Sequence, residues 1–105
     1  MIAVREFLDP QGGCPYKIWF DRLNPQAAAK VAIALTRLAL GNFSNVKSVG
    51  SGVFELRISF GPGYRVYFGT DGDRLLILLG GGTKQRQQRD IAAAIANWQD
   101  YKRRK

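Results

Sequence analysis

The chain has 105 residues, enough for one domain with a core of its own, and 46% of them are hydrophobic, which is typical of a globular protein. Sixteen Lys and Arg against eight Asp and Glu give a formal net charge of +8, which favours a polyanionic partner or simply a charged, soluble surface. With no histidine and one cysteine, the sequence excludes an internal disulfide, a Ser-His-Asp triad and the common histidine-based zinc and ribonuclease sites.

The first half of the chain predicts a short strand and two helices. A strand is expected from Met1 to Phe7. Pro15 suits the first turn of a helix that carries apolar residues at helical spacing, namely Tyr16, Trp19, Phe20 and Leu23. Pro25 opens a second, alanine-rich helix that ends near Gly41. Its apolar stripe is Ala28, Val31, Leu35 and Leu38, while Lys30 and Arg37 share its outer face.

The second half changes to the alternation of a β-sheet. Apolar residues from Phe54 to Phe60 alternate with Glu55, Arg57 and Ser59, which predicts a strand with one buried face. A second strand from Tyr64 to Phe68 follows a glycine turn, and Asp71-Gly72 predicts a tight hairpin. The return strand, Leu75 to Leu79, is apolar on both faces and should therefore be central.

A last helix completes the predicted fold. Gly80-Gly81-Gly82 should end the return strand, and Thr83 is the expected N-cap of a helix with Ile91, Ile95 and Trp98 on one stripe. The order β-α-α-β-β-β-α predicts one α+β domain over residues 1–105. We expect a mostly antiparallel four-stranded sheet with two N-terminal helices and a C-terminal helix. No apolar run is long enough for a signal peptide or a membrane span, so we expect a cytoplasmic protein without membrane contact.

A basic cluster is the strongest functional pattern. If the apolar residues of the alternating strands face the helices, Arg57, Arg65 and Tyr67 share the opposite face. Lys84 and Arg86 follow the last strand at the rim. Basic side chains around an aromatic ring suit phosphate contact and base stacking, although a solvated sheet face is the alternative interpretation. No pattern predicts a metal site or a cofactor, since Asp71 and Asp73 indicate only a hairpin.

Two segments carry a resemblance to a known family. Residues 46–58 and the stretch Gly63-Tyr64-Arg65-Val66-Tyr67-Phe68 resemble the RelE/ParE toxin superfamily, and within it the HigB-like addiction module killer group. Residues 78–84 and 89–91 are similar to the same group. The resemblance implies the toxin of a type II toxin–antitoxin module, neutralised by a helix-turn-helix antitoxin, with a possible toxin–antitoxin hetero-oligomer on operator DNA. For the RelE/HigB branch it implies ribosome-dependent cleavage of mRNA without a metal, which inhibits translation.

The resemblance also implies roles for individual residues. Arg65 would stabilise the charged phosphate, Arg57 would contact the RNA backbone or share that role, and Lys84 would be a proton donor or electrostatic partner. Tyr67 ranks above Tyr101 as the general base, on the expectation that neighbouring arginines lower its pKa. The RNA-binding residues would be Lys47, Arg86, Tyr101 and Lys102. Two alternatives remain: a ParE-like gyrase inhibitor, and an inactive module that only binds its antitoxin.

Overall fold

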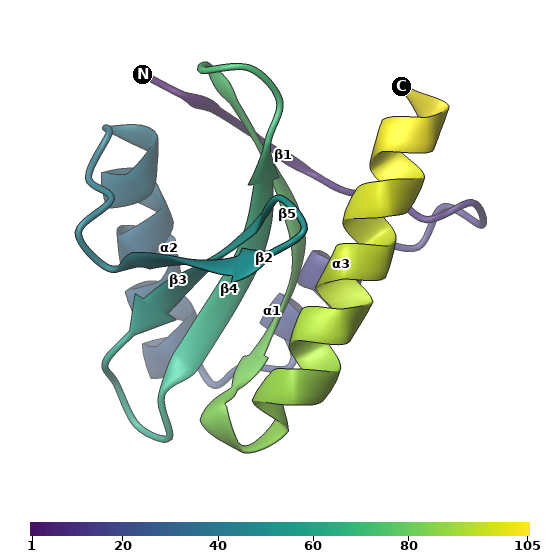
Figure 1. Cartoon of the computed structure of the whole chain (residues 1–105). Helices are drawn as coiled ribbons and strands as arrows, with labels where there is room; N and C mark the ends of the chain where they lie inside the picture. Colours follow the sequence, from purple (N-terminus) through teal and green to yellow (C-terminus); the bar gives the residue numbers. More distant parts are fainter.

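The computed structural model describes residues 1–105 and contains one mixed five-stranded sheet between two layers of helices (Figure 1). The elements in chain order are β1 (Ala3–Glu6), α1 (Pro15–Asp21), α2 (Pro25–Ala39), β2 (Val46–Gly50), β3 (Val53–Ile58), β4 (Tyr64–Thr70), β5 (Leu75–Thr83), a 3-10 turn η1 (Lys84–Arg86) and α3 (Gln87–Arg104). The strand order is β1-β5-β4-β3-β2, with β1 parallel to β5 and every other pair antiparallel.

The prediction of four strands is wrong by one. Residues 46–50 form an edge strand, β2, that pairs with β3 across a tight turn. This strand has only two apolar side chains, Val46 and Val49, so its alternation is too weak to be read from the sequence. The turn places Gly50 and Gly52 at positive φ, a conformation that glycine adopts without strain, and Ser51 between them also has a positive φ.

The glycine run does not end the return strand as predicted. β5 continues to Thr83, where Gly81 and Gly82 pair with Val66 and Arg65 of β4. Thr83 is consequently a strand residue: its side chain makes no capping hydrogen bond, and α3 begins only at Gln87. The prediction of Thr83 as the N-cap of the last helix is therefore wrong.

The two N-terminal helices begin where their prolines predict. The Cys14 and Asn24 side chains accept hydrogen bonds from the first turns of α1 and α2 and cap them. Val31 and Leu38 of α2 are fully buried as predicted, with Ala27 in place of Ala28 as the small buried residue of the first turn. Both helices lie on the same side of the sheet, and α3 lies on the other (Figure 1).

Each face of the sheet carries its own core. Leu76 and Leu78 of β5 pack towards α1 and α2, whereas Ile77 and Leu79 pack with Ala94 and Trp98 of α3. The prediction that this strand is covered on both sides is therefore correct. None of the three helices combines the length and apolar character that crossing a bilayer requires.

Candidate functional site

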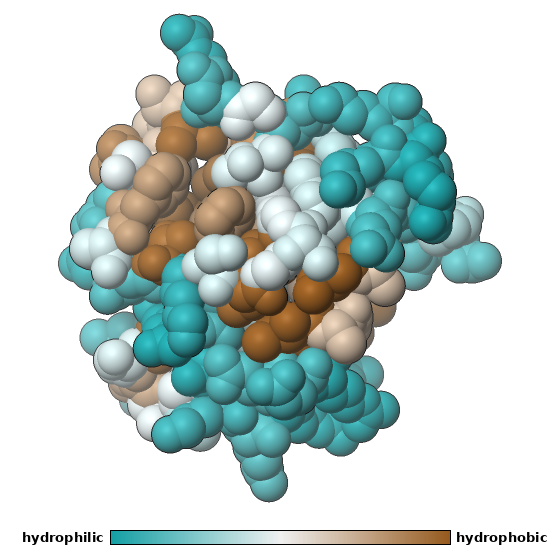
Figure 2. Space-filling model, viewed as in Figure 1, coloured by the Kyte–Doolittle hydropathy of each residue, from teal (hydrophilic) through white to brown (hydrophobic).

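The candidate site lies at the end of the sheet where β3 ends, β4 begins and β5 runs into α3. Hydrophilic side chains gather at the lower edge of the molecule in Figure 2, below a band of apolar surface. Figure 1 shows that the β3–β4 turn and the start of α3 meet at this edge. The backbone N–H of Lys84 donates to the carbonyl of Gly63 at 3.2 Å, which fixes the start of η1 against that turn.

The strand register brings the two predicted arginines together. Arg57 pairs with Arg65 across β3 and β4, and the neighbouring pair on the same face is Glu55 with Tyr67. Lys47 of β2 pairs with Glu55 from the outer edge and is exposed. Alternation within the strands thus places Arg57, Arg65 and Tyr67 on one face, as the sequence predicts.

This face is not the open surface that the sequence suggested. Arg65 is only 9% exposed and Tyr67 is fully buried, because α3 covers the face beside them. Arg57 stays half exposed near the end of β3. Of the three, only Arg57 presents an open side chain to solvent, while Arg65 is almost fully buried beside Glu55.

A buried carboxylate, Glu55, holds the arginines in place. One of its oxygens accepts a hydrogen bond from Arg57 Nε at 3.1 Å, and the other accepts one from Gln87 Nε2 at 2.9 Å. Arg65 Nε lies 3.4 Å from Glu55 Oε2 as a further ion pair. Burial by itself raises the pKa of Glu55, but the hydrogen bonds from Arg57 and Gln87 and the charge of Arg65 outweigh it and hold the pKa below its ordinary value. Glu55 is therefore ionised at neutral pH.

The Arg65 guanidinium keeps unused hydrogen-bond donors. Its Nε, despite the ion pair, and its Nη1 are buried without a hydrogen bond of ordinary geometry. A buried donor without an acceptor costs about 1–3 kcal/mol. Both nitrogens are shielded from solvent, so an anion reaches them only when the surrounding side chains move aside. Since one carboxylate lies between two guanidinium groups, the local charge also remains positive.

Basic side chains form an exposed rim at the start of α3, which Gln87 connects to Glu55 and thereby to Arg65. A hollow of about 410 Å³ is lined only by polar and charged residues from the end of β5 to the first turn of α3, namely Lys84, Gln85, Arg86, Gln87, Gln88 and Arg89. Lys84, Arg86 and Arg89 are exposed and have no carboxylate partner within ion-pair distance. The rim can therefore contact phosphate groups without first breaking an internal ion pair.

Tyr67 does not have the electrostatics of a general base. Burial raises the pKa of its hydroxyl well above the ordinary value, and the charge of Glu55 raises it further, whereas Arg65 has only a small opposing effect. Arg65 therefore acts in the expected direction, but burial and Glu55 outweigh it, and the expected net lowering of the Tyr67 pKa is wrong. The Tyr67 hydroxyl is protonated at neutral pH and makes no hydrogen bond of ordinary geometry.

Asp90 is a functional candidate that the sequence did not single out. It lies in the first turn of α3, and a Cβ on Gly82 would overlap its carboxylate, so Asp90 packs directly over the glycine that pairs with Arg65. Burial raises the pKa of Asp90, although Arg86 and Arg89 act in the opposite direction. The carboxylate is partly exposed, unlike that of Glu55.

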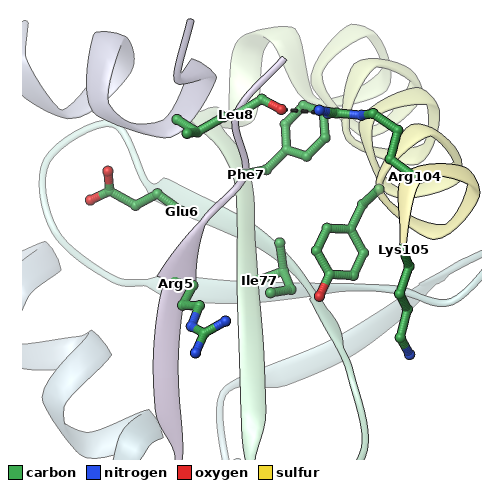
Figure 3. A pocket seen from close by; sticks show the side chains of 8 residues that line it. Arg5, Glu6, Phe7, Leu8, Ile77, Arg104 and Lys105 are labelled. Atoms are coloured by element: carbon green, nitrogen blue, oxygen red, sulfur yellow. Dashed lines mark hydrogen bonds between the residues drawn. The ribbon is translucent and has the colours of Figure 1, made fainter. Parts of the chain in front are cut away.

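Tyr101 and Lys102 lie at the other end of α3, away from the site. The Tyr101 hydroxyl donates to Asp71 Oδ2 at 2.7 Å, in the β4–β5 hairpin. Tyr101 also lines a separate hollow of about 270 Å³ between β1 and the last turn of α3. Figure 3 shows Arg5 approaching this hollow from β1, with Arg104 and Lys105 on the side of α3. The structure therefore does not bring Tyr101 and Lys102 together with Arg65.

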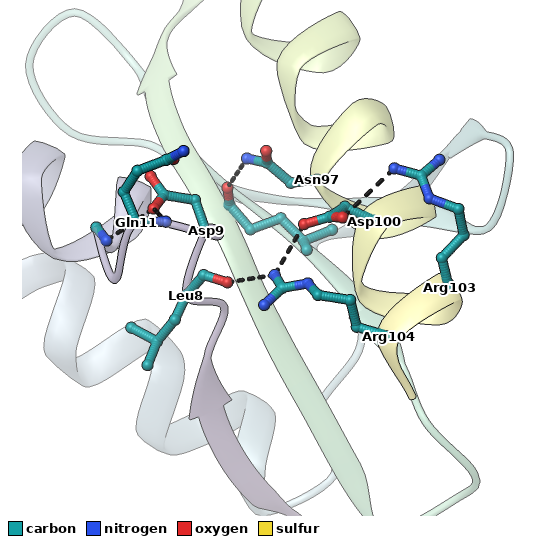
Figure 4. Close-up of polar contacts among 9 residues, drawn as sticks. Leu8, Asp9, Gln11, Asn97, Asp100, Arg103 and Arg104 are labelled. Atoms are coloured by element: carbon teal, nitrogen blue, oxygen red, sulfur yellow. Dashed lines mark hydrogen bonds and ion pairs between the residues drawn. The ribbon is translucent and has the colours of Figure 1, made fainter.

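The basic C-terminus is held against the fold rather than frayed. Arg104 donates to the carbonyl of Leu8 at 2.5 Å and pairs with Asp100, which also pairs with Arg103 (Figure 4). One turn earlier, Asn97 Nδ2 donates to the carbonyl of Leu79 at 3.0 Å. Leu79 lies at the register shift between β4 and β5, where it has no pairing residue in β4. These contacts fix the axis of α3 and thereby the position of its first turn at the site.

Comparison with known proteins identifies the family. The model of a family described as "Phage derived protein Gp49-like (DUF891)" matches residues 18–99, more than half of the chain. The chain belongs to the Gp49-like family. This family is related to the RelE-like toxins of toxin–antitoxin modules, which agrees with the resemblance at the superfamily level. An uncharacterised protein of Haemophilus influenzae is 48% identical over 77 residues, which cover 72% of this chain and 78% of that protein.

The Gp49-like segment contains the whole candidate site. Arg57, Arg65, Lys84 and Asp90 all lie between residues 18 and 99, whereas Tyr101, Lys102 and the strand β1 lie outside it. Sequence reasoning missed Glu55 as the residue between the two arginines, although the same alternation that pairs Arg57 with Arg65 places Glu55 beside them. No sequence signal connects Gln87 or Asp90 with these strands, because their contacts depend on where α3 packs.

Proposed function

We propose that this Gp49-like protein is a toxin that cleaves mRNA on the ribosome, without a metal ion, and that a cognate antitoxin neutralises it. The observation that carries the proposal is the open rim of exposed cations, Lys84, Arg86 and Arg89, which Gln87 links to the buried ion pair of Glu55 with Arg65. Exposed cations next to a fixed guanidinium suit a phosphate whose negative charge increases during reaction.

The proposed reaction is attack of a ribose 2′-OH on the adjacent phosphate, which forms a 2′,3′-cyclic phosphate and releases the 5′-oxygen of the next nucleotide. The bond to phosphorus forms on the 2′-oxygen and breaks at the 5′-oxygen, while one proton leaves the former and one reaches the latter. Arg65 stabilises the charge on the non-bridging oxygens, and Arg57 contacts the neighbouring backbone. Lys84, exposed at the rim, donates the proton to the leaving oxygen or stabilises its charge.

Three side chains near Arg65 are candidates for the general base. Tyr67 is protonated and buried, and Glu55 is fully buried with both oxygens engaged by its partners. Asp90 is partly exposed, and its raised pKa makes it a stronger base than an ordinary aspartate. We therefore assign the proton transfer from the 2′-OH to Asp90, which replaces the earlier ranking of Tyr67.

The proposed function is tested with purified protein in a cell-free translation reaction, with the 5′ ends of the reporter mRNA mapped. The wild type should produce ribosome-dependent cuts, and Arg65→Lys and Lys84→Gln should each reduce the cleavage rate at least about 100-fold, the size expected when one donor to a transition-state oxyanion is lost. Arg65→Lys keeps a cation beside Glu55, so it protects the fold better than an alanine substitution does. Asp73→Asn, in the exposed hairpin, is the matched control.

Other outcomes of the same experiment contradict the proposal. Intact mRNA together with gyrase-linked DNA breaks would indicate a ParE-like gyrase inhibitor. Intact mRNA and intact DNA, with an antitoxin still bound, would indicate a module that only binds its partner. Cleavage by Arg65→Lys at the wild-type rate would remove Arg65 from the site.

A further inference from the structure

A second basic surface lies between α2 and the end of β3. A groove of about 290 Å³ is lined by Lys30, Ile33, Ala34, Arg37, Asn45, Arg57, Ile58, Ser59 and Phe60. A smaller hollow of about 60 Å³ shares four of these residues and adds Asn42, Ser44 and Leu56. Neither is lined by an acidic residue, and of the three cations of this groove only Arg57 has an ion-pair partner, Glu55, whereas Lys30 and Arg37 have none.

The two cations on α2 are not neutralised by an internal ion pair. Lys30 and Arg37 are exposed, and no carboxylate lies within ion-pair distance of either. They are seven residues apart, which places them on one side of the helix at a separation of about 10 Å along its axis. Lys30 Nζ also lies 5.5 Å from the centre of the Phe60 ring, at the lower end of the groove.

Arg57 connects this groove to the candidate site. It lines the groove and the smaller hollow, and its Nε donates to Glu55, the carboxylate that also pairs with Arg65. Arg65 itself is almost fully buried and lines neither hollow, so Arg57 is the residue that the groove and the candidate site share. An acidic peptide could satisfy the cations, but Arg57, which the groove shares with the proposed cleavage site, favours a nucleic acid strand.

We propose that the groove between α2 and β3 binds the sugar-phosphate backbone of single-stranded RNA beside the cleavage site. This inference rests on the proposed function and extends it, because it assigns Lys30 and Arg37 to substrate binding. Lys30 and Arg37 contact phosphates, and the side chains of Asn45 and Ser59 supply neutral hydrogen-bonding groups between them. The open ends of the groove suit a flexible strand rather than a duplex.

The test measures RNA affinity independently of cleavage. The probe is a fluorescent 12-nucleotide RNA with 2′-O-methyl groups, which cannot undergo attack by its own 2′-oxygen, and binding is followed by anisotropy from low to high NaCl. The variant Lys30→Gln/Arg37→Gln is compared with Arg74→Gln/Arg103→Gln, which removes the same charge at exposed positions in the β4–β5 hairpin and at the end of α3. Melting temperatures confirm that both variants are folded.

Loss of two phosphate contacts should reduce the slope of log K against log salt by about 1.4, since each contact to a single strand contributes about 0.7. For each tenfold rise in salt, the factor by which RNA affinity falls should therefore be about 25 times smaller in the groove variant than in the wild type. It should also bind more weakly at low salt, and the control should match the wild type in slope. An unchanged slope in the groove variant overturns the inference, as does weakened binding of a polyglutamate peptide with unchanged binding of the RNA.

These results are separable from the proposed function. If the wild type fails to cleave mRNA but the slope still falls in the groove variant, the RNA-binding groove stands and the nuclease proposal fails. If the wild type cleaves mRNA and the slope is unchanged, the nuclease proposal stands and the groove is not an RNA-binding surface.

Discussion

Glu55→Gln replaces the buried carboxylate between Arg57 and Arg65 with an isosteric neutral amide, and we expect it to destabilise the fold. The amide keeps one acceptor and turns its N–H groups either towards Arg57, on one side, or towards Gln87 and Arg65, on the other. Removing one partner of a buried ion pair costs about 3–5 kcal/mol. The contact with Arg57 adds little, because that side chain is 48% exposed and an exposed pair contributes about 0–1 kcal/mol.

The expected loss is therefore about 3 kcal/mol, which is large against a total stability of about 5–15 kcal/mol for an ordinary domain. It corresponds to a fall in Tm of at least about 12 °C for a domain of this size. Urea unfolding at pH 7, followed by the fluorescence of Trp19 and Trp98, measures the difference directly. Asp73→Asn removes an exposed carboxylate that has no ion pair and should change the free energy of unfolding by less than about 0.5 kcal/mol.

The pH dependence provides a second check with a definite sign. The pKa of Glu55 lies below its ordinary value of 4.5 in the folded state, so its stabilising contribution is complete above that value and is lost as pH falls through the folded pKa. The difference in the free energy of unfolding between wild type and Glu55→Gln should accordingly become smaller as pH falls into the acid range. A gap below about 1 kcal/mol at pH 7, or one that stays constant from pH 7 to pH 3, would refute the assignment of Glu55 as the charge that holds Arg65.

Two further predictions concern the groups around Arg65. Asp90→Asn should abolish cleavage and raise Tm at neutral pH. Because the pKa of Asp90 is raised in the folded state, its protonated form stabilises the fold at low pH, and this contribution is lost as pH rises through the folded pKa. Wild-type cleavage should decline as Asp90 becomes protonated in acid, and an active Asp90→Asn enzyme would eliminate it as the base. Tyr67→Phe removes a buried hydroxyl without a good hydrogen bond, so stability should stay equal or increase by up to about 1–3 kcal/mol with unchanged cleavage. A cleavage defect in a folded Tyr67→Phe protein would reinstate the hydroxyl as part of the site.

Local periodicity predicted most of the elements and part of the site. The prolines located the starts of α1 and α2, and the alternation in β3 and β4 placed Arg57, Arg65 and Tyr67 on one face. These inferences succeed because each depends on residues within one turn or on the two-residue repeat of a strand. The edge strand β2 and the continuation of β5 through Gly80–Gly82 were missed, since their pairing depends on neighbours far away in the chain.

Composition and local pattern by themselves determined that the chain is an α+β domain with an excess of positive charge and two arginines on neighbouring strands. Only the tertiary structure decided what those arginines do. The packing of α3 across the second face buries Tyr67 and Arg65, brings Gln87 to Glu55 and Asp90 to Gly82, and carries Tyr101 to the opposite end of the sheet. Strand alternation specifies a side of the sheet, but burial and pKa depend on the element that covers that side, and its position is set by contacts between residues distant in the sequence.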